Sequence, residues 1–149
     1  MIEHTSLHTN SKVRQWLDRL IAHPSVTPDQ TACQDEIASF LETMGFEITQ
    51  WQHGSVKNMM ATIGRQGPML AWLGHTDVVP PGTLKRWNSH PFKVTWSSDG
   101  KAYGRGVADM KGAIAAVLSA IEQSQLDAHV DQASFALILT GDEEGEAID

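Results

Sequence analysis

The sequence has one cysteine, no long apolar run and fewer basic than acidic residues, and each shortage excludes a class of protein. Cys33 has no second thiol to pair with, so we expect no internal disulfide and a reducing, cytoplasmic environment. No segment approaches the ~18 consecutive apolar residues of a membrane-spanning helix, so we expect no membrane partner. Residues 1–10 hold neither Lys nor Arg nor an apolar stretch, so we expect no secretory signal there.

The charge is acidic and unevenly distributed. Eleven basic residues against 18 acidic ones give a net charge of −7, which argues against a nucleic-acid partner. The last eight residues, Asp142–Asp149, hold five acids and no base. By composition alone this segment would be interpreted as a solvated tail. The residues that precede it favour another interpretation.

Hydrophobic spacing predicts an α/β domain. Apolar residues recur at helical spacing in residues 13–21, 37–44 and 114–121, with Ser11 placed to cap the first helix. The pattern predicts strands at residues 46–52, 58–64, 69–73 and 133–140, and a hairpin across residues 92–103 that turns at Asp99-Gly100. Residues 69–73 are apolar throughout, which is typical of a central strand. We therefore predict an α/β fold with a mixed sheet flanked by helices.

The end of the chain is unusual for such a domain. The strand at residues 133–140 runs directly into the acidic segment, without a closing helix. We therefore expect residues 1–149 to be the N-terminal portion of a longer catalytic domain.

A first polar cluster, Gly74-His75-Thr76-Asp77, follows the apolar strand at residues 69–73. Residues two apart in an extended segment lie on the same side, which brings His75 and Asp77 together. A carboxylate commonly orients a metal-binding imidazole through its second nitrogen. His75 is thus a candidate metal ligand and Asp77 its partner. The alternative is a strand-end histidine that is hydrogen-bonded to a turn aspartate.

A second cluster runs from Gly104 to Gly112. Its Gly104/Gly106 pair resembles part of a dinucleotide loop, but Asp109 stands where the third glycine belongs and would repel a pyrophosphate. Near a predicted helix N-terminus a carboxylate is favoured, and its two oxygens could bridge two cations. The alternative is an ordinary aspartate N-cap.

A third cluster, Asp142-Glu143-Glu144, follows the other apolar strand. Adjacent carboxylates repel one another unless cations are present. In a two-metal hydrolase one of them binds metal, while its neighbour moves a proton from water to the leaving amine. The alternative is a solvated loop.

The three clusters resemble, in order, the motifs of the M20 family of zinc peptidases and deacylases. The similarity covers nearly the whole chain, and its motifs are long and ordered. They read Gly74-His75-Thr76-Asp77-Val78-Val79-Pro80-Pro81-Gly82, Arg86-Trp87, Pro91-Phe92, Gly104-Arg105-Gly106, Ala108-Asp109-Met110-Lys111-Gly112 and Thr140-Gly141-Asp142-Glu143-Glu144-Gly145. Residues 24–29 and 33–34 are similar to the family's N-terminal segment.

The resemblance implies a role for each residue of the site. His75 would bind one metal, Asp109 would bridge two, and Glu144 would bind the second. Glu143 would be the general base and acid, and Asp77 would orient His75. The implied cofactors are two Zn²⁺ ions, with Co²⁺ as a possible substitute. The resemblance also implies a cis peptide after Asp109 and leaves Asp142 as a loop residue or a partner of the ligands.

The same resemblance implies parts beyond this sequence: two further metal ligands, groups that bind the substrate's carboxylate, and a lid and dimerisation domain. We therefore expect a small-molecule substrate and a homodimer for the longer protein. The rival hypothesis is a non-catalytic remnant or metal-binding module. The other histidines match no ligand position and are expected at the surface or in structural roles: His4, His8, His23, His53, His90 and His129.

Overall fold

A computed structural model describes residues 11–28, 31–124 and 133–147 of the chain. Its main sheet has four strands in the order β1-β2-β6-β3, in which β3 and β6 are parallel and the other pairs are antiparallel. The predicted α/β fold with a mixed sheet flanked by helices is confirmed. The sheet strands are β1 (Glu47–His53), β2 (Val56–Ile63), β3 (Met69–His75) and β6 (Ser134–Thr140).

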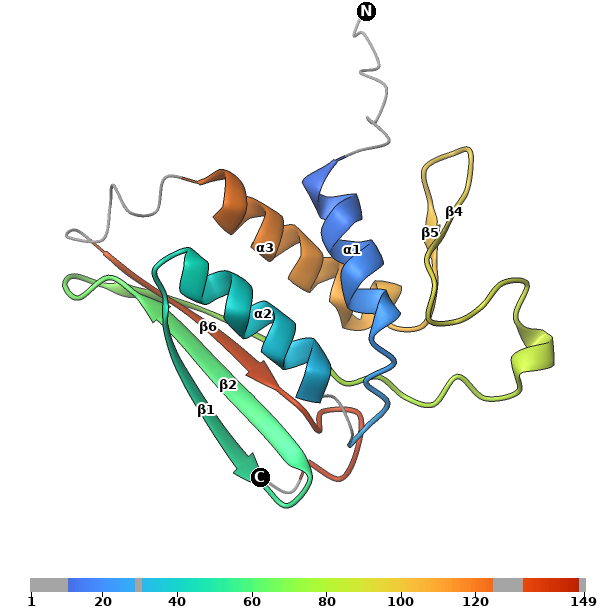
Figure 1. Cartoon of the computed structure of the whole chain (residues 1–149), viewed down its shortest axis with the longest axis horizontal. Helices are drawn as coiled ribbons and strands as arrows, with labels where there is room; N and C mark the ends of the chain where they lie inside the picture. The colour runs from blue at the N-terminus through green and yellow to red at the C-terminus, as the bar shows by residue number, and fades with distance from the viewer. Residues whose placement is uncertain (1–10, 29–30, 125–132, 148–149) are drawn as a thin grey trace, which may run out of the picture.

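Three helices pack together with this sheet (Figure 1). They are α1 (Lys12–Ala22), α2 (Thr31–Thr43) and α3 (Gly112–Gln123). Ser11 caps α1 as predicted, because its side chain accepts a hydrogen bond from the Arg14 N–H. None of the helices in the described residues is long and apolar enough to cross a membrane.

One apolar core joins the helices to the sheet. Its members come from all three helices and from alternate positions of the strands, as the predicted amphipathic patterns require. Cys33 lies in it with no exposed surface, and burial raises the pKa of its thiol to about 11. Fully buried members include Leu20, Ile21, Ile37, Leu41, Met59, Ile114, Leu118, Leu137 and Leu139.

The central position predicted for residues 69–73 is wrong. β2 and β6 are the interior strands, and β3 lies at the edge of the sheet with Met69, Leu70 and Leu73 60%, 69% and 66% exposed. An apolar run indicates that both faces of a strand can be buried. It does not determine the place of the strand in the sheet or which elements cover its faces. Among the described residues, β6 is the one strand that pairs with β3.

The segment between β3 and α3 carries smaller elements. A short helix η1 (Leu84–Arg86) precedes a hairpin of β4 (Thr95–Trp96) and β5 (Ala102–Tyr103), which confirms the predicted hairpin with shorter strands. Gly100 turns it with a φ of 82°, a conformation that favours glycine. The turn η2 (Val107–Lys111) then leads into α3.

Lys111 attaches this turn to α1. Its side chain is 1% exposed, and its ammonium donates to the carbonyls of Leu20 at 2.9 Å and His23 at 2.7 Å. Carbonyls at a helix C-terminus lack partners within the helix and favour a positive charge. Burial lowers the pKa of Lys111. The buried ammonium thus fixes the turn that carries Asp109 against the end of α1.

We expect Lys111→Met to lower the free energy of unfolding by about 2 kcal/mol, because the carbonyls of Leu20 and His23 each lose a charged donor while the side-chain stem is kept. Urea denaturation of the chain and the variant measures this difference. Lys93→Met, at an exposed lysine, is the control and should leave the unfolding midpoint unchanged. Equal midpoints for all three proteins would contradict the role assigned to Lys111.

Candidate metal centre

The first and third polar clusters follow the C-terminal ends of β3 and β6, which lie at the same end of the sheet. β3 and β6 are parallel, and their register ends with the pair His75 and Thr140. The N–H of Thr76 donates to the carbonyl of Thr140 at 3.0 Å, which continues the pairing one step further. The carboxyl ends of neighbouring parallel strands are where α/β sheets place ligands.

His75 is buried, at 5% exposed, and faces oxygen atoms on both sides of its ring. Its Nδ1 lies 3.0 Å from the Asp77 carbonyl oxygen and 3.4 Å from the Asp77 carboxylate. Its Nε2 lies 3.1 Å from Oδ1 of Asp109 and 3.6 Å from Oε2 of Glu143. One nitrogen thus contacts Asp77, while the other is directed toward two carboxylates from different clusters.

Asp77 is fully buried and joins two of the clusters. Its carboxylate accepts hydrogen bonds from the N–H of Glu143 at 3.3 Å and of Glu144 at 2.9 Å. Burial alone would raise the pKa of Asp77, but its hydrogen bonds to His75 and to these two N–H groups lower it. Asp77 therefore contacts the imidazole through both its carbonyl and its carboxylate, and the same carboxylate holds the loop that presents the glutamate pair.

Asp109 comes from η2, where its φ of −132° and ψ of 103° are extended rather than helical. It is not the N-cap of α3, since Lys111 holds that position, so the alternative of an ordinary cap is excluded. The peptide bond between Asp109 and Met110 is cis, as the family resemblance implies. The Asp109 side chain is 72% exposed, so one side of its carboxylate remains open to solvent.

Close packing brings η2 against the end of β3. The N–H of His75 donates to the sulfur of Met110 at 3.3 Å. A Cβ at Gly74 would lie 2.9 Å from the Met110 side chain and 2.6 Å from that of Trp72. A larger residue at this position would require the side chains of Trp72 and Met110 to move.

Three of the predicted residues form a compact donor set. One ligand atom each from His75, Asp109 and Glu144 can be chosen so that all lie within 4.8 Å of one another. An imidazole with two carboxylates suits Zn²⁺ and related divalent ions, so these residues fit the metal site that the sequence predicts. Burial raises the pKa of Glu144, and the nearby Asp109 carboxylate raises it further.

The fifth predicted residue, Glu143, lies at the solvent side of this set. Its side chain is 59% exposed, and its Oε2 is directed toward His75. The structure thus brings together all five residues singled out in the sequence. Adjacent carboxylates in a loop held by Asp77 and facing Asp109 do not resemble a solvated tail.

Sequence reasoning missed the polar residues beneath the site. Gln34 donates to the hydroxyl of Thr76 at 3.0 Å, and Asn58 accepts from the N–H of Gly141 at 2.9 Å. The hydroxyl of Ser25 donates to the carbonyl of Thr76 at 2.8 Å. All are buried. Ser25 and Gln34 lie in the segments that are similar to the family's N-terminal part, but no spacing links either of them or Asn58 to the site.

The remaining histidines lie apart from the donor set where they are described. His53 and His90 are exposed, and His23 is half-buried and pairs with Glu36. The expectation of surface or structural roles is confirmed for these three. His4, His8 and His129 lie outside the described residues.

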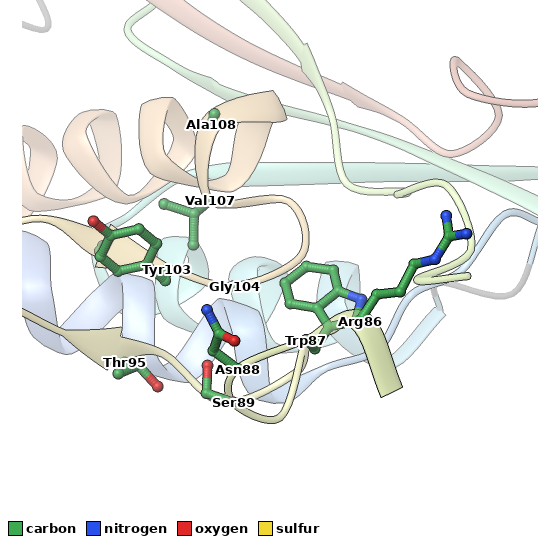
Figure 2. Close-up of a pocket in the computed structure, with 10 residues that line it drawn as sticks. Arg86, Trp87, Asn88, Ser89, Thr95, Tyr103, Gly104, Val107 and Ala108 are labelled. Atoms are coloured by element: carbon green, nitrogen blue, oxygen red, sulfur yellow. The ribbon is translucent and has the colours of Figure 1, made fainter. Parts of the chain in front are cut away.

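A cavity of about 490 Å³ lies beside η2, between the β4–β5 hairpin and the loop around η1 (Figure 2). Trp87, Tyr103 and Val107 give it an apolar wall, and Asn88 and Ser89 add polar groups. None of the five candidate residues lines it, although Ala108 precedes Asp109 directly. The candidate chemistry therefore lies at the open strand ends rather than in this cavity.

Comparison with known proteins identifies similar sequences. Residues 71–148 match the family described as Peptidase family M20/M25/M40. A succinyl-diaminopimelate desuccinylase from Xylella fastidiosa (strain 9a5c) is 50% identical over 131 residues, which cover 87% of this chain and 34% of the relative. One from Alkalilimnicola ehrlichii is 42% identical over 139 residues, covering 93% and 37%. The chain spans about a third of the length of these relatives.

Solved structures show the same fold. Human carnosine dipeptidase 1 superposes with a TM-score of 0.75 at 23% identity, covering 91% of this chain and 33% of the other. The M20 family metallo-carboxypeptidase Sso-CP2 from Sulfolobus solfataricus gives a TM-score of 0.75 at 22% identity, covering 91% and 32%.

The protonation of His75 should make metal-free stability depend on pH. The hydrogen bond with Asp77 raises the pKa of His75 to about 9, although desolvation opposes it. A raised pKa stabilises the folded state below the unfolded pKa of about 6.5. That contribution is lost as pH rises toward 9. We expect the stability difference between the chain and His75→Gln, measured in EDTA, to shrink from pH 6 to pH 9.5.

His53→Gln, which removes an exposed histidine, is the matched control and should show a constant difference across this range. A difference for His75→Gln that stays constant or grows would contradict the pKa given for His75.

Proposed function

Because the chain belongs to peptidase family M20/M25/M40, we propose that the whole protein is a metal-dependent amide hydrolase, and specifically a succinyl-diaminopimelate desuccinylase. Its reaction would convert N-succinyl-L,L-2,6-diaminopimelate and water into succinate and L,L-diaminopimelate, as a step of diaminopimelate and lysine biosynthesis. The observation that carries the proposal is the convergence of His75, Asp109 and Glu144 within 4.8 Å at the ends of β3 and β6.

Two Zn²⁺ ions are the proposed cofactors, and Co²⁺ is a possible substitute. His75 would bind the first ion, Asp109 would bridge both and Glu144 would bind the second. When bound, the ions supply Lewis-acid polarisation of the amide carbonyl and lower the pKa of water. The chain's own contribution is to keep the imidazole oriented through Asp77 and to hold the loop of Glu143 and Glu144 on the Asp77 carboxylate.

Glu143 is the proposed proton carrier. It would take a proton from the attacking water as the oxygen adds to the amide carbon. It would then deliver that proton to the amine nitrogen as the carbon–nitrogen bond breaks. Its exposed position beside His75 and Asp109 supports this role, since a proton carrier must reach both the water and the leaving group.

The residues of two motifs support the succinyl substrate. Two desuccinylases that this chain resembles are 50% identical over 131 residues, and residues 76–82 and 140–145 resemble the motifs of that enzyme. The alternative is another M20 deacylase, such as acetylornithine deacetylase or an aminoacylase. Turnover of succinyl-diaminopimelate and acetylornithine by the full-length protein separates the two.

The proposal includes parts that residues 1–149 do not contain. A further acidic ligand, a histidine ligand and the groups that bind the substrate's carboxylate would lie in the rest of the protein. So would a lid and dimerisation domain, through which a homodimer would bring a histidine of one subunit to the site of the other. A cytoplasmic location would match the biosynthetic role and the single cysteine.

We expect Glu143→Gln in the full-length enzyme to lower kcat by about 100-fold or more, because the amide cannot carry the proton. Steady-state desuccinylation, with metal content measured on the same samples, tests this. Glu146→Gln removes an exposed charge three residues away and should leave kcat unchanged. If Glu143→Gln keeps most of its activity with metals bound, the role of Glu143 is wrong.

We expect residues 1–149 alone to show negligible hydrolysis and weak or partial metal loading, because only three of the five proposed protein ligands are present. Assays of the purified chain with added Zn²⁺, beside the full-length protein, measure both. Robust zinc-dependent turnover by the shorter chain would overturn this expectation. Absence of turnover from both proteins would instead favour the rival of a non-catalytic metal-binding module.

A further inference from the structure

The segment that follows α1 contacts the loops after both β3 and β6. The N–H of Val78 donates to the carbonyl of Ser25 at 3.0 Å, and the N–H of Thr27 donates to the carbonyl of Val78 at 3.1 Å. Val26 and Val78 form a parallel bridge. Residues 25–27 therefore lie alongside the end of the His75–Asp77 loop like a short additional strand.

Thr27 extends this contact to the loop after β6. Its hydroxyl donates to Oδ1 of Asp142 at 3.0 Å. Asp142 is 6% exposed, so its carboxylate is removed from water and depends on such a donor. A Cβ at Gly145 would lie 2.0 Å from that same oxygen and 2.8 Å from the Thr27 hydroxyl, which shows how closely the turn packs on this pair.

The acidic loop, residues 142–145, is thus held at successive residues by Thr27 and Asp77, next to the Gly141 N–H that donates to Asn58. Thr27 binds the side chain of Asp142, and Asp77 binds the N–H groups of Glu143 and Glu144. The N–H of Gly145 returns to the carbonyl of Asp142 at 3.4 Å and closes the turn. Loss of the Thr27 contact releases the side chain of Asp142, while the hydrogen bonds of Glu143 and Glu144 to Asp77 and of Gly141 to Asn58 remain.

We propose that Thr27 is a positioning residue, whose hydroxyl fixes Asp142 and thereby the placement of Glu143 and Glu144 opposite His75 and Asp109. The roles of the two glutamates in this inference rest on the proposed function, but the hydrogen bond itself does not. Thr27 acts through Asp142 and is not a member of the candidate donor set.

The test compares Thr27→Val, which removes only the hydroxyl, with Thr27→Ser, which keeps it. Hydrogen–deuterium exchange of the full-length, metal-free protein should be faster at Glu143 and Glu144 in Thr27→Val by about tenfold, as expected for loss of one hydrogen bond to a charged group. With zinc added, kcat should fall by about tenfold while KM stays within about twofold, because the glutamates are misplaced rather than removed.

Thr27→Ser and Thr49→Val, the latter at an exposed threonine of β1, should match the unmodified protein in both measurements. If Thr27→Val does not fold, Gly145→Ala gives the same test, because its methyl group displaces the Thr27–Asp142 pair sterically.

Unchanged exchange at both glutamates in Thr27→Val overturns the proposal, and so does an equal effect of Thr27→Ser. The exchange measurement needs neither metal nor substrate. A full-length protein without desuccinylase activity therefore defeats the proposed function and leaves this inference open to the same exchange test.

Discussion

The arrangement of the site depends on one buried carboxylate. Asp77 has no exposed surface, yet it contacts the imidazole of His75 and the backbone N–H groups of Glu143 and Glu144. A buried negative charge is costly unless several donors share it. The donors around Asp77 are the candidate ligand and the loop of the glutamate pair. Satisfying this charge therefore also assembles the site.

Much of the fold could be predicted from local pattern, because helix and strand periods report which faces are apolar. Ser11, Gly100 and the stripe through Leu118 and Ile121 act through neighbours close in sequence, and the elements they predict are present. The position of β3 could not be predicted in this way. Strand order depends on pairings between distant segments, and the apolar runs of β3 and β6 look alike in sequence although only β6 is central.

The five candidate site residues stood out because each lies in a short run of unusual polarity next to an apolar element. The parallel pairing of β3 with β6 brings His75 and Asp77 to Glu143 and Glu144, and the packing of η2 against the end of β3 adds Asp109. The sequence implies these approaches only through the ligand chemistry itself. The supporting residues carry no such signal. Lys111, Thr27 and Gln34 each bind a group more than 40 positions away in the chain, so nothing in their local sequence indicates those partners.

The exposed edge strand has a practical consequence for handling residues 1–149 in isolation. β3 presents a row of backbone donors and acceptors that no strand among the described residues occupies on its outer side, flanked by the exposed side chains of Met69, Leu70 and Leu73. Unprotected apolar edges of this kind recruit strands from other molecules. The net charge of −7 opposes such contacts by mutual repulsion, which salt screens. The isolated chain should therefore associate with other copies more readily at high ionic strength and less readily in dilute buffer.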